Sequence, residues 1–179
     1  MASMILLCGT LIVFAQLSFM HSQSLGVKTN QTLVVKFPGH TEGLNTKLEA
    51  MKKTIARLPL VYQVTFSGAV PGEEVATFLS NRRTNDALKQ NRLYEMLACD
   101  PDYVDAYGLQ VVAGRNFSED YGDDVDKLVI NETAVRNLGF TSNDEAIGEL
   151  VNVECTDAPM QIIGVVKDYH QQALSKNYT

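Results

Sequence analysis

Clustered basic residues and a nucleotide-binding glycine loop are both missing from this sequence. Its 15 lysine and arginine residues are spread thinly, with no basic run longer than Lys52-Lys53 or Arg82-Arg83. With a net charge of −6, the chain has no extended positive surface for the phosphates of a nucleic acid. No Gly-x-x-x-x-Gly-Lys-Ser/Thr motif occurs, so the chain does not bind nucleotide phosphates in the P-loop manner.

Patterns of catalytic or metal-binding residues are also scarce. The three histidines, His21, His40 and His170, are at least 19 residues apart and form no His-x-x-x-His pair for zinc. Ser67 lacks the glycine two positions earlier that a nucleophile elbow requires. We therefore expect a protein that is not an enzyme, with no catalytic, cofactor-binding or metal-binding residue.

One acidic stretch is the best remaining candidate for a cation site. It contains Glu119, Asp120, Asp123, Asp124 and Asp126. Their order does not match the Asp-x-Asp-x-Asp-Gly pattern of a calcium loop. The favoured interpretation is therefore a solvated acidic turn.

The chain has three cysteines. Cys8 lies in the apolar N-terminal stretch, whereas Cys99 and Cys155 lie in the second half of the chain. In an oxidising compartment these two could form a disulfide. The sequence does not give the distance between their Cα atoms, so a disulfide and two free thiols both remain open.

The longest apolar stretch runs from Met4 to Met20. A membrane-spanning helix needs about 20 such residues, so this stretch is at the short end of the range. A secretory signal would carry a basic segment before the apolar one, but no Lys or Arg precedes Lys28. The sequence favours the outer part of a membrane helix, with a buried helix as the alternative. We expect residues 1–27 to form this helix and its exit segment.

Residues 28–90 contain a strand–helix–strand pattern. Residues 32–37 and 61–66 are rich in β-branched residues and are followed by Gly or Pro, which is typical of strands. Between them, apolar residues from Leu44 onward recur every three or four positions up to Pro59, which predicts a helix. The pattern predicts a βαβ unit, followed by a loop with one edge strand over residues 73–90.

Residues 91–179 predict a second lobe of mixed helices and strands. Asp100 is expected to cap a short helix that has Pro101 at its first position and ends at Gly108. Ser142 and Glu145 form a capping box. The predicted strands are residues 93–98, 109–113, 127–130, 150–154 and 160–166, the last two forming an antiparallel hairpin, and a further helix covers residues 133–138. The fold class is therefore α+β with two lobes.

Several residues of this lobe are expected to act as scaffold and not as ligand-binding groups. Gly108 and Gly114 flank a strand where a positive φ or a close backbone approach is expected. Arg115 can reach a carbonyl or carboxylate with its planar guanidinium. Phe117 is expected to fill the core, and Asn131 to cap the following helix.

Three phrases in fixed order carry the remaining information. They are Asp102-Tyr103 with Gly108-Leu109 and Gly114 to Ser118, then Val129 to Ala134, then Ile162 to His170. Together they resemble the MacB-like periplasmic core domain of MacB/FtsX-type ABC transporter permeases. In that family a first transmembrane helix leads into the domain, and Gln16 to Phe19 and Leu25 to Val27 occupy the matching places. The family's first lobe is completed by a returning βαβ half, which we expect to be missing from this chain.

The resemblance implies transport without catalysis. An ABC ATPase subunit would supply the energy, and the permease would act as a homodimer or heterodimer that contacts cargo or a periplasmic partner. The expected location is the bacterial inner membrane, with the domain in the periplasm or outside the cell. A ligand-binding sensor domain and, less favoured, a secreted hydrolase are the alternatives, but neither explains the three ordered phrases.

Overall fold

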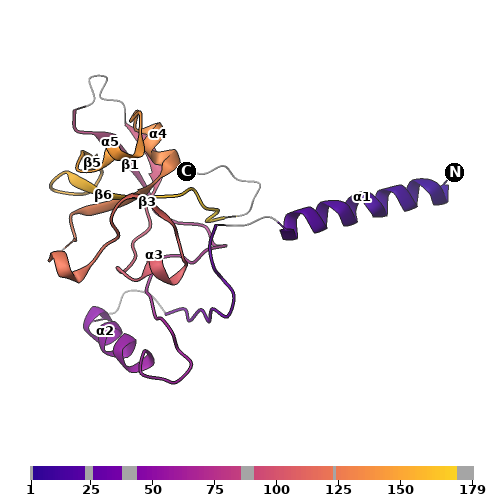
Figure 1. Ribbon diagram of the computed structural model, residues 1–179, viewed down its shortest axis with the longest axis horizontal. Coiled ribbons are helices and arrows are strands. Elements are labelled where there is room, and N and C mark those ends of the chain that lie inside the picture. The colour runs from indigo at the N-terminus through magenta and orange to yellow at the C-terminus, as the bar shows by residue number, and fades with distance from the viewer. Residues whose placement is uncertain (1, 23–25, 38–43, 86–90, 123, 173–179) are drawn as a thin grey trace.

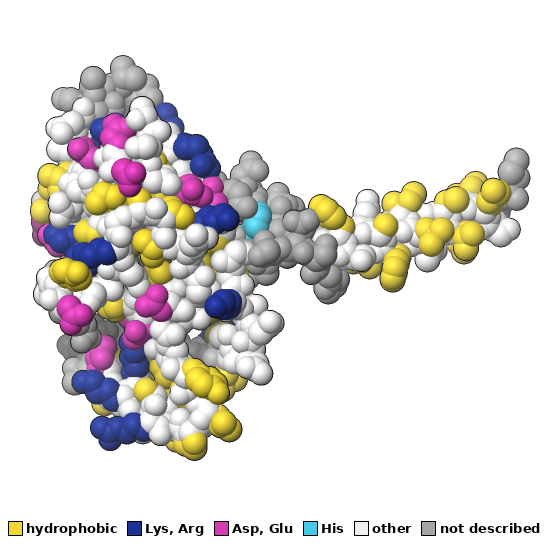
Figure 2. Space-filling view, in the orientation of Figure 1, with side chains coloured by type: hydrophobic (Ala, Val, Ile, Leu, Met, Phe, Trp, Pro, Cys, Tyr) yellow, Lys and Arg dark blue, Asp and Glu magenta, His cyan; other side chains and the backbone are white. Residues whose placement is uncertain are grey.

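The computed structural model describes residues 2–22, 26–37, 44–85, 91–122 and 124–172. Its first element, α1 (Ala2–Ser22), confirms the helix expected over the apolar stretch and extends away from the rest of the molecule (Figure 1). Large apolar side chains on all sides of α1 are exposed to solvent, and no charged side chain interrupts them (Figure 2). Within the described part of the chain, no helix has the combination of length and hydropathy needed to cross a membrane.

The second helix, α2 (Leu44–Ile55), matches the predicted helix and lies apart from the sheet in Figure 1. The strands predicted for residues 32–37 and 61–66 on either side of it were wrong, because both segments lack regular secondary structure. A strand needs a neighbouring strand to bond its backbone groups. Leu33 is 87% exposed and Tyr62 is 95% exposed. In the described part of the chain, neither segment has a neighbouring strand that would bond its backbone and cover these side chains.

A six-stranded mixed sheet forms the centre of the fold. Five strands follow the order β2-β1-β5-β6-β3 with antiparallel pairing, and β4 pairs in parallel with β6. The strands are β1 (Phe78–Arg83), β2 (Arg92–Glu95), β3 (Val111–Gly114), β4 (Lys127–Asn131), β5 (Leu150–Val153) and β6 (Met160–Val166). The α+β class and the predicted β5–β6 hairpin are confirmed.

β6 is the most buried strand because β3, β4 and β5 all pair with it. Its run of Ile and Val is typical of a strand covered on both faces. Ile162 and Val165 are fully buried in the main core cluster. β1 also belongs to this sheet, so the sheet crosses the boundary predicted at residue 90.

Short helices complete the second lobe. They are α3 (Tyr103–Ala106), the 3-10 turn η1 (Glu119–Tyr121), α4 (Glu132–Asn137) and α5 (Asn143–Ala146). The N-cap residue of α4 is Asn131, whose side chain accepts a hydrogen bond from the Ala134 N–H, which confirms the predicted cap. Ser142 caps α5 in the same way through the Glu145 N–H. The prediction that Asp100 caps α3 was wrong, because the N-cap residue is Asp102.

Candidate functional site

The three sequence phrases lie next to one another where β3 and β4 pair with β6. Gly114 of β3 lies opposite Gly164 of β6, and the Arg115 N–H donates to the Ile163 carbonyl at 2.9 Å. On the other side of β6, Val129 pairs with Gly164. Segments that are distant in the sequence therefore share one backbone hydrogen-bond network.

Asp168 joins the third phrase to the second. Its carboxylate accepts hydrogen bonds from the Thr133 N–H at 2.8 Å, the Thr133 hydroxyl at 2.9 Å and the Arg136 guanidinium at 2.8 Å. In return, Glu132 accepts from the Asp168 N–H at 3.3 Å. A carboxylate at the first turn of α4 stabilises the positive end of that helix. Both oxygens of Asp168 are therefore used in holding α4 against the end of β6.

Arg115 forms a two-point ion pair with Asp124. Both nitrogen–oxygen distances are 2.8 Å, and the guanidinium also lies 4.3 Å from the centre of the Tyr121 ring. Hydrogen bonds from Arg115 and from the Ser118 N–H hold the pKa of Asp124 down at about 2. Arg115 thus reaches a carboxylate, as its planar donor group predicted.

The acidic stretch forms no recognisable cation site in the described part of the chain. Asp124 is bound to Arg115, Asp126 contacts Lys127 at 3.0 Å, and Asp123 lies outside the described residues. No group of three or more His, Cys, Asp or Glu side chains among the described residues is arranged to hold a metal ion.

Asp100 forms the joint between α2 and the second lobe. Its carboxylate accepts from the Lys52 ammonium at 2.6 Å and the Phe66 N–H at 3.1 Å, and also from the Thr65 hydroxyl. Lys52 contacts Asp102 as well, at 2.5 Å. Burial alone would lower the pKa of Lys52, but the hydrogen bonds and charges of the two carboxylates outweigh it and raise the pKa above 10.5. Apart from the closeness of Asp100 and Asp102 in the chain, no sequence pattern indicates this joint.

The segment that follows α1 is docked on the second lobe. The Lys28 N–H donates to the Tyr107 carbonyl at 2.8 Å, and the stem of Lys28 covers Gly108. Val27 packs into the cluster of Tyr103, Tyr107 and their neighbours. Gly108 has φ +61, a backbone conformation that residues with a Cβ rarely adopt, which explains the glycine at this position.

A tyrosine-rich cluster lies beneath this docking segment. The rings of Tyr103 and Tyr107 pack in a tilted arrangement with their centres 4.8 Å apart, and Tyr169 packs against the same cluster. Burial, reinforced by nearby groups, raises the pKa of Tyr103 strongly and that of Tyr169 to about 12. Burial next to Asp100 also raises the pKa of Cys99 to about 11, so its thiol is protonated at neutral pH.

The remaining candidate residues have ordinary structural environments. Cys99 and Cys155 are both free thiols. The Ser67 hydroxyl donates to the Ala69 carbonyl at 2.7 Å. His170 is half-buried at the end of the third phrase, the side chain of His21 is not described, and His40 lies outside the described residues.

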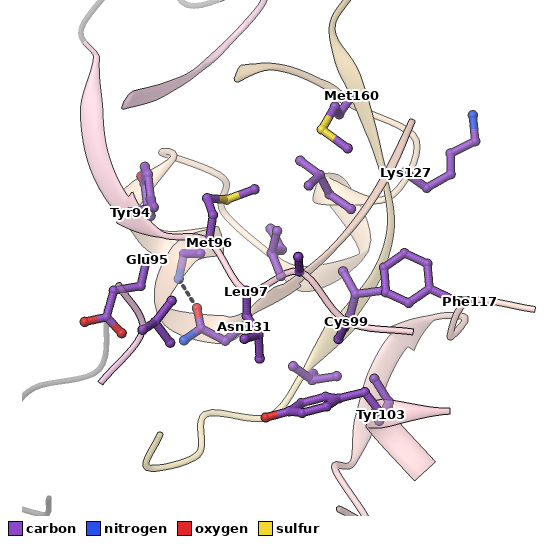
Figure 3. Close-up of a pocket in the computed structure, with 18 of the residues that line it drawn as sticks. Tyr94, Glu95, Met96, Leu97, Cys99, Tyr103, Phe117, Lys127, Asn131 and Met160 are labelled. Atoms are coloured by element: carbon purple, nitrogen blue, oxygen red, sulfur yellow. Dashed lines mark hydrogen bonds between the residues drawn. The ribbon is translucent and has the colours of Figure 1, made fainter. Parts of the chain in front are cut away.

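A cavity of about 960 Å³ lies between the sheet and α3, and the sequence analysis did not foresee it. Met96, which directly follows β2, and Met160 of β6 project toward the same space, and Tyr103 lies at its edge (Figure 3). Phe117, expected in the core, is only half-buried and lines this cavity.

Comparisons with known proteins identify one family and several similar solved structures. A family model described as MacB-like periplasmic core domain matches residues 2–178. The periplasmic region of MacB from Actinobacillus actinomycetemcomitans is 21% identical with a TM-score of 0.48, covering 70% of this chain and 51% of that one. The extracellular domain of the noncanonic ABC-type transporter YknZ from Gram-positive bacteria is 20% identical with a TM-score of 0.49, covering 67% and 57%. The chain thus spans little more than half of these domains, and no curated protein matches it.

Proposed function

The chain belongs to the family of MacB-like periplasmic core domains, and we propose that it relays ATP-driven motion within an ABC transporter permease. In this proposal an ABC ATPase subunit supplies the energy, and the domain carries the displacement to cargo or to a partner protein. The domain itself performs no catalysis. The proposed location is the bacterial inner membrane, with the domain in the periplasm or outside the cell.

The docking of residues 26–28 on the second lobe is the observation that carries this proposal. This segment follows α1 in the chain, and it contacts Tyr107, Gly108 and Tyr169 directly. A movement of α1 along its axis would therefore be passed to the tyrosine cluster over a short connection. From there, the backbone network of β3, β6 and β4 would carry it through the sheet.

α1 is proposed to anchor the domain in the membrane. Its exposed side chains include Ile5, Leu7, Ile12 and Phe14, and the helix carries no Lys, Arg, Asp or Glu. A charge-free apolar surface of this size is unfavourable in water, whereas lipid would cover it. Figure 2 supports this division, since charged side chains cover the body of the molecule and not α1.

The Asp100 joint would keep α2 moving together with the sheet. Its ion pair with Lys52 is largely shielded from solvent, with the two side chains 17% and 13% exposed.

We further propose that another segment of the permease or a partner supplies strands to the first lobe. The exposed apolar side chains of Leu33 and Val35 support that proposal.

Distance measurements in the assembled transporter would test the relay. We propose to replace Cys8, Cys99 and Cys155 with serine, to attach a spin label through Leu93→Cys, and to reconstitute the permease with its ATPase subunit. Leu93 is exposed and lies on the edge strand β2. If the permease is a dimer, as we propose, ATP binding is expected to shift the distance between the labels of the two copies.

The Val27→Asp change should uncouple the relay, because it places a charge in the tyrosine cluster. We expect it to remove the ATP-dependent shift while ATP turnover continues. Val125→Asp, at an exposed valine, is the matched control and should keep the shift. An unchanged distance in the parent protein during active ATP hydrolysis would refute the relay.

A further inference from the structure

Two residues that line the cavity carry buried polar atoms without a hydrogen-bond partner in the described part of the chain. Asn81 is 5% exposed and Tyr94 is 6% exposed, and both line the cavity. Within the described part of the chain, the Asn81 Oδ1 and the Tyr94 hydroxyl have no hydrogen-bond partner. Leaving such groups unpaired in an apolar interior costs about 1–3 kcal/mol each.

The strand register places both groups on the same face of the sheet. Tyr94 pairs with Leu79 across β1 and β2, and Leu79 and Asn81 are two residues apart on β1. Side chains two positions apart on a strand share a face, as do directly opposite residues. The Asn81 amide nitrogen donates to the Met96 sulfur at 3.4 Å, so the amide oxygen is the atom left without a partner in the described part of the chain.

The rest of the lining defines which ligand would fit. It is largely apolar, including Leu79, Val104, Leu128, Val151 and Met160. A volume of about 960 Å³ is within the range of small-molecule sites. These features favour an apolar molecule over a strongly hydrated one.

Charged groups at the cavity are already engaged with other protein groups. Asp124 binds Arg115, Lys127 contacts Asp126, and Glu95 accepts a hydrogen bond from Gln172 at 2.8 Å. A charged ligand would have to displace one of these contacts. A neutral ligand would not.

We propose that this cavity binds a neutral, predominantly apolar molecule with a hydroxyl group, and that the side chains of Asn81 and Tyr94 turn from their buried positions to hold that hydroxyl. A hydroxyl can donate to the Asn81 oxygen and can accept from the Tyr94 O–H. Burial raises the pKa of Tyr94, so its phenol remains a donor at neutral pH. The site stands apart from the relay, since it concerns binding alone and needs no ATPase.

A matched pair of probes tests the site on the full chain in lipid nanodiscs. The probes are 4-phenyl-1-butanol and butylbenzene, which differ by the hydroxyl group. The methionine methyl groups, labelled with carbon-13, report binding by NMR because Met96 and Met160 line the cavity while Met51 lies on α2. Empty nanodiscs give the correction for probe that dissolves in lipid.

We expect saturable shifts at Met96 and Met160 and none at Met51. The alcohol should bind about threefold to tenfold more tightly than the hydrocarbon, because its two hydrogen bonds outweigh the desolvation of its hydroxyl. Absence of saturation, or equal shifts at Met51, would overturn the proposed site.

Two variants test the roles of the polar groups. Asn81→Leu and Tyr94→Phe should each reduce the preference for the alcohol by about threefold or more while binding of butylbenzene persists. Tyr94→Phe removes a single oxygen atom, so it keeps the test valid if Asn81→Leu misfolds. Tyr62→Phe, on a tyrosine outside the cavity, should leave the preference unchanged. An unchanged preference in both cavity variants would overturn the assignment.

Discussion

Gly114 and Gly164 lie directly opposite each other where β3 crosses β6. A Cβ added to Gly114 would lie 2.2 Å from the Ile163 carbonyl oxygen, and one added to Gly164 would lie 2.1 Å from the Arg115 carbonyl oxygen. Both obstacles are backbone atoms, which cannot rotate away as a flexible side chain can. This close contact allows the first and third phrases to share hydrogen bonds, and it explains a glycine in each of them.

We therefore predict that Gly164→Ala destabilises the fold by about 3 kcal/mol, since the strands must separate to admit the methyl group. Gly139→Ala is the control, because Gly139 has φ +82 but no atom within 4 Å of an added Cβ, and it should cost about 1 kcal/mol. Urea unfolding followed by circular dichroism measures both. Equal losses would contradict the close-contact explanation.

The Arg115–Asp124 pair should give stability that depends on acid pH. The pKa of Asp124 falls from 3.8 to about 2 on folding, so the ionised carboxylate favours the folded state. This contribution is fully present above about pH 4 and is lost as the pH falls toward 2. The stability difference between the parent protein and Asp124→Asn should shrink over that range in urea titrations. Asp157→Asn, at an exposed site, is the control, and a difference independent of pH would count against the pair.

Removing the carboxylate of Asp100 should loosen α2 from the second lobe. Asp100→Ala leaves the Lys52 ammonium with Asp102 alone and removes the partner of the Phe66 N–H. We expect a loss of about 2–3 kcal/mol and faster trypsin cleavage at the lysines of α2. Asp105→Ala, at an exposed position of α3, should change neither. Unchanged cleavage in Asp100→Ala would show that other contacts hold the joint.

Cys99 and Cys155 should differ in their reactivity. With a pKa of about 11, Cys99 has about 0.1% thiolate at pH 8, whereas Cys155 is exposed to solvent. Alkylation with iodoacetamide, followed by mass spectrometry, should therefore modify Cys155 much faster. Urea-unfolded protein, in which both thiols react alike, is the control. Faster modification of Cys99 in the folded protein would contradict its burial.

Predictions based on local chemistry were the most successful. The Asn131 cap, the positive φ of Gly108 and Gly114, and the β5–β6 hairpin depend on a few neighbouring residues, and the structure confirms them. The predicted strands over residues 32–37 and 61–66 failed because strand pairing needs a second segment, and their composition gives no information about that partner. The prediction that Asp100 caps a helix was wrong for a similar reason. Its side-chain partners are 34 to 48 residues away in the chain, so the neighbouring residues do not reveal them.

The sequence by itself determined the family resemblance through its three ordered phrases. It also determined the α+β class and the main helices, because apolar periodicity and capping act over a few residues. Only the tertiary structure decided that β1 joins β5, that Asp100 links α2 to the second lobe, and that Asn81 and Tyr94 line a cavity. These features depend on which distant segments come into contact. That choice is made by burial and hydrogen bonding over the whole chain, so no short pattern records it.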